Sequence, residues 1–143
     1  MGELEPMTYA FPVVPRYAEV DQQGVVFNGH YLTWFDEAFT GFLDHAGMSY
    51  PDLIAAGVDV MVVHSELDYR GSVRWRDDAR VEVVCERQGT TSFTLGFSVY
   101  RSADEVAVTG RNVYVVVVKD EATGAWSKAP GIPEKLAAAL SGA

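Results

Sequence analysis

The chain has 143 residues, of which 48% are hydrophobic and 12% aromatic, which favours one compact domain with a sizeable core over a disordered or fibrous protein. Twenty acidic against 11 basic residues give a net charge of -9, which opposes nucleic-acid binding because that binding requires dense phosphate neutralisation. Cys85 is the only cysteine, which excludes an internal disulfide and a cysteine-based zinc site.

The sequence carries no pattern of export or of membrane insertion. Its first ten residues lack a basic start followed by an apolar stretch, and no apolar run approaches the roughly 20 residues that cross a bilayer. Together with the single cysteine, this predicts a cytoplasmic protein in a reducing compartment that needs no membrane partner. We find no internal repeat or long linker, which predicts one domain over residues 1–143.

The first expected element is a strand from Phe11 to Val20, whose prolines suit the edge of a sheet. The glycine-ended turn that follows, Asp21 to Gly24, places one acidic side chain directly ahead of an apolar helix. The first N–H groups of a helix have no partner within it and lie at the positive end of its dipole, where a developing oxyanion is stabilised. A catalytic base and an oxyanion site would therefore adjoin, although on this motif alone Asp21 is more often a turn residue.

A long helix is predicted from His30 to Ala46, because apolar residues recur there at helical spacing. The apolar face extends almost around the axis, so other elements must cover most of this helix. His45 in the last turn and Gly47 directly after it are ordinary helix stop signals.

From Val58 onward the pattern changes to strands rich in Val, Phe, Tyr and Thr. Short links, with hairpin turns at 88–91 and 102–104, favour antiparallel pairing. One helix followed by a meander predicts an α+β fold in which a curved sheet wraps a central helix. The run Val113 to Val118 is apolar on both faces, which predicts that another subunit covers the outer side of the sheet. The expected strands are Val60–Tyr69, Ala79–Arg87, Ser92–Tyr100 and Val106–Val118, and a short helix is expected over Pro133–Leu140.

Several segments match a known family in order and in spacing. They include Asp21 to Val26, where an aspartate is followed by two residues, a glycine and two apolar residues, and the helical segment Tyr31 to Ala38. The chain resembles the hotdog-fold acyl-CoA thioesterases of the 4-hydroxybenzoyl-CoA thioesterase type from Phe11 to Pro133. This resemblance implies a five-stranded antiparallel sheet around one long central helix, with dimers joined edge to edge and active sites between two subunits. Further matches are Asp68-Tyr69, Arg74–Asp77, Thr91–Phe93 and Thr109–Arg111.

The resemblance also implies a set of site residues. Asp21 takes the place of the catalytic aspartate, and the backbone N–H of Asn28 takes the place that polarises the thioester carbonyl. Phe27 and Tyr31 would lie near the acyl group, and Gly24 belongs to the turn signature. The sequence leaves open whether Asp21 attacks the carbonyl carbon or draws a proton from water.

The chain departs from the family pattern at two positions. Asn28 stands where many similar sequences carry a histidine, and its side chain could orient water or cap the helix. Thr90 stands where relatives often place a basic residue that would contact the phosphates of coenzyme A. In this chain the hydroxyls of Thr91 and Ser92 could bind these phosphates instead. His64 could approach the cleft, although a structural role is the commoner one for such a histidine.

These features predict hydrolysis of an acyl-CoA or acyl carrier protein thioester by a homodimer or homotetramer. No metal or organic cofactor is expected, because the sequence has no H-E-x-x-H spacing, P-loop or dinucleotide-binding glycine pattern. The alternatives are a non-catalytic hotdog module that binds an acyl thioester and a hotdog hydratase or dehydratase. The identity of the acyl group stays open, since the residues that could line a pocket could equally fill an ordinary core. These residues are Trp34, Phe35, Phe39 and Met48.

Overall fold

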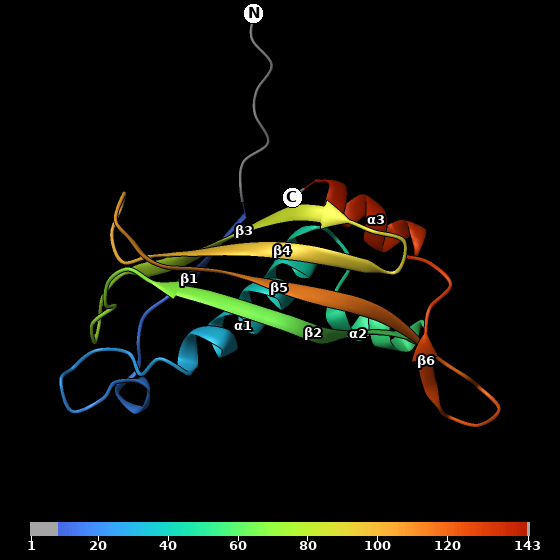
Figure 1. Cartoon of the computed structure of the whole chain (residues 1–143), viewed down its shortest axis with the longest axis horizontal. Coiled ribbons are helices and arrows are strands. Elements are labelled where there is room, and N and C mark those ends of the chain that lie inside the picture. Colours follow the sequence, from blue (N-terminus) through green and yellow to red (C-terminus); the bar gives the residue numbers. More distant parts are fainter. Residues whose placement is uncertain (1–8, 143) are drawn as a thin grey trace, which may run out of the picture.

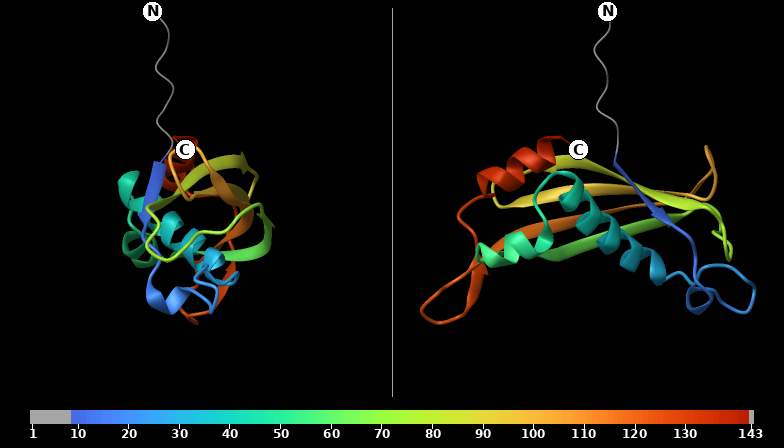
Figure 2. Two further views of the ribbon diagram at one scale, coloured as in Figure 1. Left: turned by 90° about the vertical axis from the view of Figure 1, so that its left-hand side faces the viewer. Right: turned by 180° about the vertical axis from the view of Figure 1, so that it is seen from behind.

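One long helix, α1 (His30–His45), lies against the concave side of a curved antiparallel sheet (Figure 1). The computed structural model describes residues 9–142, so the predicted single domain over residues 1–143 includes residues 1–8 and 143 that lie outside the described part. Seen end on, the sheet curls around the helix (Figure 2). The helix predicted from His30 to Ala46 is confirmed to within one residue at its end.

The strands follow the order β1-β3-β4-β5-β2, and every neighbouring pair is antiparallel. This is the hotdog arrangement that the resemblance implies, with a short sixth strand added beside β5. The strands are β1 (Tyr9–Val13), β2 (Val58–Tyr69), β3 (Ala79–Gln88), β4 (Ser92–Tyr100), β5 (Val106–Lys119) and β6 (Trp126–Lys128).

Three parts of the chain differ from the sequence prediction. The first strand ends at Val13 rather than Val20, and the segment after it turns away from the sheet into a short 3-10 helix, η1 (Tyr17–Glu19). The helix α2 (Tyr50–Ala55) has only six residues, too few to give a periodic apolar pattern, and Ser49 caps its start. The three residues of β6 are all exposed, so no alternation marks them. The last helix, α3 (Glu134–Ser141), lies where a helix is predicted and packs against β3.

Aromatic rings join α1 to the sheet. Phe35 of the helix stacks on Phe97 of β4, with ring centroids 4.5 Å apart and planes 5° from parallel. Further along, Phe39 stacks on Tyr114 of β5 at 4.9 Å. Because these rings are fully buried, they fix the position of the helix along the sheet.

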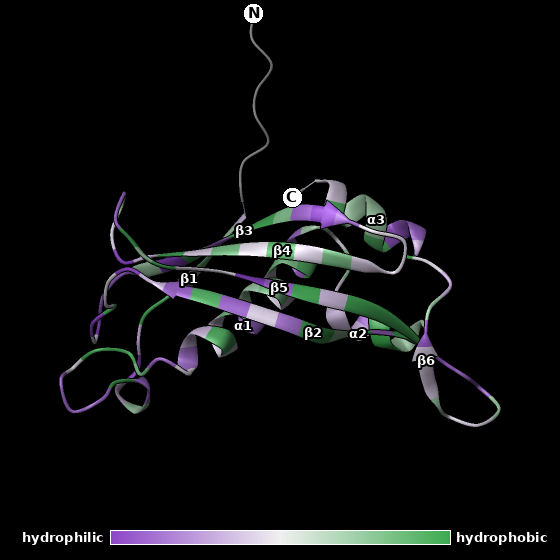
Figure 3. Ribbon diagram, in the orientation of Figure 1, coloured by the Kyte–Doolittle hydropathy of each residue, from purple (hydrophilic) through white to green (hydrophobic). Residues whose placement is uncertain are grey.

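The β2 edge of the sheet is exposed and apolar near its middle. The β2 edge has an irregularity between Val62 and His64, and Met61, Val62 and Val63 beside it are exposed by 57%, 45% and 59%. The C-terminal half of β5 next to it is mostly hydrophobic (Figure 3). An exposed apolar edge strand is a template for pairing with another chain. No helix within residues 9–142 is long and apolar enough to cross a membrane.

Gly110 of β5 lies close against Phe35 of α1. A Cβ at this position would lie 2.7 Å from a ring carbon of Phe35 and 2.7 Å from the carbonyl oxygen of Glu66, so both contacts would have to be relieved by a shift. We expect Gly110→Ala to lower the free energy of unfolding by about 1–3 kcal/mol in a urea titration, because it overpacks a filled core. Gly71→Ala is the matched control, since a Cβ there meets nothing closer than 3.8 Å. Equal stability of the two variants would contradict this account of the packing.

Candidate active site

The chain between β1 and α1 folds back on itself in a tight turn. Val20 and Val26 form an antiparallel bridge, and between them the N–H of Asp21 donates to the carbonyl of Val25 at 2.8 Å. The N–H of Gly24 donates to the carbonyl of Asp21 at 2.9 Å, with Gly24 at φ +77°. Glycine adopts this left-handed conformation without steric cost, so the predicted glycine is what lets the turn close.

A second stretch of chain holds this turn from one side. The N–H of Val26 donates to the carbonyl of Val73 at 2.8 Å, and Val25 forms a bridge with Arg74. The N–H of Trp75 donates to the carbonyl of Gly24 at 3.1 Å. The loop between β2 and β3 therefore positions the turn through its backbone, whatever side chains the two segments carry.

Glu19 holds the turn from the other side, and sequence reasoning did not single it out. Its carboxylate is buried and accepts the indole N–H of Trp34 at 2.6 Å and the Nε of Arg16 at 3.1 Å. Its carbonyl accepts the N–H of Phe27 at 2.9 Å. Burial raises the pKa of Glu19, but the hydrogen bonds from Arg16 and Trp34 outweigh burial and hold that pKa below its ordinary value. The signal for this contact was Trp34 itself, since a buried indole N–H requires an acceptor.

Asp21 lies exposed at the outside of the turn. One carboxylate oxygen accepts the N–H of Gln23 at 2.8 Å, which is the ordinary hydrogen bond of an aspartate in a turn. The other oxygen has no hydrogen-bond partner among residues 9–142. Asp21 is thus a turn residue that still presents a free carboxylate oxygen.

The start of α1 lies at the end of the same turn. The N–H groups of Asn28 and Gly29 have no acceptor within the described part of the chain, whereas the N–H of His30 donates to the carbonyl of Phe27 at 3.0 Å. Gly29 is the N-cap residue and no side chain caps the helix. The hydroxyl of Tyr69 donates to the carbonyl of Asn28 at 3.3 Å and steadies that peptide. Free donors at a helix start form a site for a negatively charged oxygen.

Phe27 and Tyr31 flank these donors in different ways. The Phe27 ring is 54% exposed and packs edge-on against His30. Tyr31 is buried, and its hydroxyl accepts the N–H of Val73 at 3.4 Å. Burial raises the pKa of Tyr31. Tyr31 therefore supports the turn from beneath, and its nearness to an acyl group stays a prediction.

The remaining predicted residues lie away from the turn within one chain. His64 is exposed on β2, where its Nε2 lies 3.2 Å from a carboxylate oxygen of Glu66. Thr91 and Ser92 lie at the hairpin between β3 and β4, at the end of the sheet opposite the Asp21 turn (Figure 1). The structure thus brings together Asp21, Gly24, Phe27, Asn28 and Tyr31 and does not bring His64, Thr91 or Ser92 to them.

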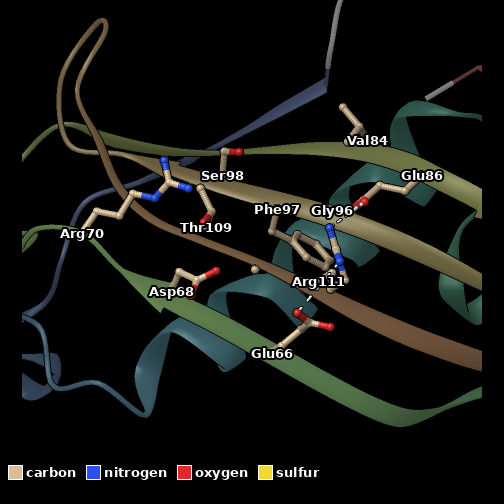
Figure 4. Close-up of a pocket in the computed structure, with 11 residues that line it drawn as sticks. Glu66, Asp68, Arg70, Val84, Glu86, Gly96, Phe97, Ser98, Thr109 and Arg111 are labelled. Atoms are coloured by element: carbon tan, nitrogen blue, oxygen red, sulfur yellow. Dashed lines mark hydrogen bonds and ion pairs between the residues drawn. The ribbon is translucent and has the colours of Figure 1, made fainter.

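Two hollows are lined by residues of β2. One of about 300 Å³ opens between α1 and the edge strand β2, and burial raises the pKa of Asp36 on its wall. Phe39, for which the sequence left a pocket wall or the core open, is buried in the core and also lines this hollow, and Trp34 and Phe35 are buried in the core. The other, about 340 Å³, lies on the opposite face of the sheet, where Arg111 pairs with Glu66 and Glu86 (Figure 4). The first hollow is lined by Asp36, Phe39, Thr40, Tyr50, Val60, Val62 and Tyr114.

No group of three or more His, Cys, Asp or Glu side chains gathers into a metal-binding arrangement within residues 9–142. At the Asp21 turn, the described residues present a carboxylate beside backbone N–H donors.

Comparison with known proteins places the chain among thioesterases. A sequence model described as the thioesterase superfamily matches residues 23–108. A protein of Bacillus subtilis named as a candidate acyl-CoA thioesterase, YneP, is 28% identical over 105 residues, which cover 73% of this chain and 76% of YneP. A 1,4-dihydroxy-2-naphthoyl-CoA hydrolase of Picosynechococcus is 26% identical over 96 residues, 66% of each chain.

Solved structures show the same fold. A hypothetical protein from Thermus thermophilus superimposes with a TM-score of 0.81 at 28% identity. The superposition covers 92% of this chain and 96% of that protein. A hypothetical protein from Aquifex aeolicus gives a TM-score of 0.83 at 22% identity and covers 92% and 98% of the two chains.

The Glu19 contact predicts how stability depends on pH. A carboxyl whose pKa is lower in the folded than in the unfolded chain adds stability above its unfolded pKa, and this stability is lost as the pH falls through the folded pKa. We expect the free energy of unfolding to fall as the pH drops below about 4.5, and Glu19→Gln to show a smaller fall. Urea titrations from neutral to acidic pH measure this, with Glu121→Gln, in the exposed loop before β6, as control. The same pH dependence in Glu19→Gln and in the unmodified protein would contradict it.

Proposed function

Since the chain belongs to the thioesterase superfamily, we propose that it hydrolyses an acyl-CoA or acyl carrier protein thioester to a free acid and a thiol, with Asp21 as the catalytic carboxylate. One observation carries the assignment of the site. The free oxygen of the Asp21 carboxylate lies on the turn that leads directly into the open N–H groups of Asn28 and Gly29. Hydrolysis of a thioester needs these two kinds of group side by side.

Thioester hydrolysis requires few further catalytic groups. A thioester is an activated acyl donor with a good leaving group, so no serine triad is needed. The carboxylate of Asp21 either attacks the carbonyl carbon and forms an anhydride that water then opens, or takes a proton from the water that attacks. In both routes negative charge develops on the carbonyl oxygen, where the N–H of Asn28 stabilises it, and the sulfur leaves as a thiolate that takes up a proton. Loss of one such donor typically costs about 10²- to 10³-fold in rate.

A homodimer formed through β2 would complete the site. Two copies of β2 that pair antiparallel run in opposite directions, so the Val58 end of one copy meets the Tyr69 end of the other. Met61 and Ser92 both pair with Val115, from opposite sides, which places Ser92 at the Val58 end of the sheet. Tyr69 contacts Asn28 at the other end. Pairing would therefore bring Thr91 and Ser92 of one copy toward Asp21 of the other, where their hydroxyls could bind coenzyme A phosphates.

The hollow beside β2 suits the acyl group. It lies between α1 and the strand edge that the dimer would cover, so pairing would close it from solvent. Its walls combine one carboxyl from Asp36 with apolar side chains and hydroxyl-bearing ones, the latter being Thr40, Tyr50 and Tyr114. This composition fits an acyl group with an apolar body that carries polar substituents.

Asp21→Asn tests the catalytic assignment. The amide keeps the size of the side chain and an oxygen for the N–H of Gln23, but it is neither a nucleophile nor a base at neutral pH. We expect thiol release from acyl-CoA to fall by about 10²-fold or more while the unfolding midpoint stays close to that of the unmodified protein. Asp104→Asn, in the exposed hairpin between β4 and β5, is the matched control and should keep full activity. A near-normal rate in Asp21→Asn rejects the assignment, and no thiol release from the unmodified protein over a broad acyl panel favours a binding module.

A mixing experiment tests the shared site. Asp21→Asn and the double variant Thr91→Ala/Ser92→Ala should each be impaired, since every site in either homodimer lacks one contribution. After the two are unfolded and refolded together, each mixed dimer holds one intact site, so activity should rise to about a quarter of that of the unmodified protein. A mixture no more active than the mean of its two components would show that one chain builds the whole site.

A further inference from the structure

A surface cluster lies beside the Asp21 turn: Tyr17 and Arg76 each contact the Trp75 ring, and Arg74 directly precedes Trp75 in the chain. Tyr17 is 78% exposed and Trp75 is 43% exposed, which is unusual for large rings on a monomeric surface. The two rings meet with centroids 5.8 Å apart and planes at 71°. Their edge-to-face contact forms a corner, and the exposed parts of the two rings are surfaces of the kind on which the face and the edge of a flat heterocycle pack.

The two arginines of this cluster are available to an anion. Arg74 and Arg76 have no carboxylate partner among residues 9–142. The guanidinium carbon of Arg76 lies 4.5 Å from the centroid of the Trp75 ring. In a chain of net charge -9, two unpaired guanidinium groups beside exposed rings mark a local site for negative charge. Four other arginines are ion-paired, namely Arg16, Arg80, Arg101 and Arg111.

The backbone of the cluster is held in a costly conformation. Arg76 has φ 67° and is the one non-glycine residue of the described range with a positive φ. The Asp77 carboxylate accepts the N–H of Arg74 at 2.8 Å, and the N–H of Asp77 donates to the carbonyl of Arg74 at 3.1 Å. This small turn keeps Arg76 over the Trp75 ring. Strain of this kind collects where a protein positions a functional side chain.

The cluster is joined to the Asp21 turn by backbone contacts. The N–H of Trp75 donates to the carbonyl of Gly24, and Arg74 is bridged to Val25. One ligand could therefore reach both the free oxygen of Asp21 and the corner between the two rings, and exposed rings beside guanidinium groups suit an aromatic base that carries phosphates.

We propose that this cluster binds the nucleotide end of coenzyme A, with the adenine in the corner formed by Tyr17 and Trp75 and the phosphates on Arg74 and Arg76, beside the hydroxyls that the proposed dimer brings to the same turn. The proposal rests on the proposed function, because it takes the ligand to be an acyl-CoA whose thioester lies at Asp21. A planar guanidinium group can donate two hydrogen bonds to one phosphate, and aromatic side chains stack on any nucleotide base. An acidic carrier protein has phosphate but no adenine, so it would leave the corner between the rings empty.

Binding of the nucleotide alone tests the proposal without any reaction. The probe is adenosine 3′,5′-bisphosphate, followed by calorimetry with the full chain. We expect Trp75→Ala to weaken its binding about tenfold or more, as loss of one base-stacking ring does, and Arg74→Gln/Arg76→Gln to weaken it and flatten its salt dependence. Trp126→Ala is the matched control, because Trp126 is 42% exposed at the far end of the sheet. This variant should bind the nucleotide as tightly as the unmodified protein does. Equal affinity in Trp75→Ala and Trp126→Ala overturns the proposal.

Kinetics with a truncated substrate separate this proposal from the proposed function. Acyl-pantetheine carries the thioester but lacks the nucleotide. We expect the ratio of kcat/KM for acyl-CoA to kcat/KM for acyl-pantetheine to fall about tenfold in Trp75→Ala and to stay unchanged in Trp126→Ala. An unchanged ratio in Trp75→Ala with hydrolysis intact overturns the nucleotide site alone, whereas no hydrolysis of either substrate by the unmodified protein overturns the proposed function. If acyl carrier protein turnover falls in the arginine variant while the nucleotide does not bind, the surface recognises a carrier protein instead.

Discussion

The hydrogen bond from the Trp34 indole to the Glu19 carboxylate joins the Asp21 turn to the central helix. It is buried and 2.6 Å long, so loss of either partner would leave a polar group without water to replace it. Glu19 in turn holds Phe27 through its carbonyl, and Phe27 is followed by the free N–H of Asn28. One buried contact therefore sets where the Asp21 turn lies relative to the start of α1, and the proposed chemistry depends on that position.

The fold supplies the frame for this contact. Stacked rings fix α1 along the sheet, and the close approach at Gly110 leaves it no room to shift. At the same end of the sheet, Tyr69 of β2 and the backbone of Val73 and Trp75 hold the turn from the outside. The edge that would pair with a second copy is exposed and apolar. The contacts that hold the Asp21 turn thus gather at one end of the sheet, and the exposed β2 edge is the one through which the proposed dimer would pair.

Much of this could be predicted from the sequence, because long periodic segments carry their own signal. The helix from His30 and the four later strands were predicted to within two residues at each end. The six-residue α2 and the exposed β6 have no pattern to detect. At the site, the turn motif pointed to Asp21 and Asn28, but Glu19 resembles any surface acid until the fold buries it against Trp34. The left-handed Arg76 is also invisible in sequence, since only tertiary contacts hold an arginine in that conformation.

The central claim is that the thioester carbonyl lies between the Asp21 carboxylate and the start of α1. A crystal structure with an acyl-CoA analogue in which a methylene group replaces the thioester sulfur tests this most directly, because the ketone cannot be hydrolysed. The account predicts its carbonyl oxygen within hydrogen-bond distance of the N–H of Asn28 and its carbonyl carbon in contact with the free Asp21 oxygen. An analogue bound with its carbonyl away from both groups would contradict the account.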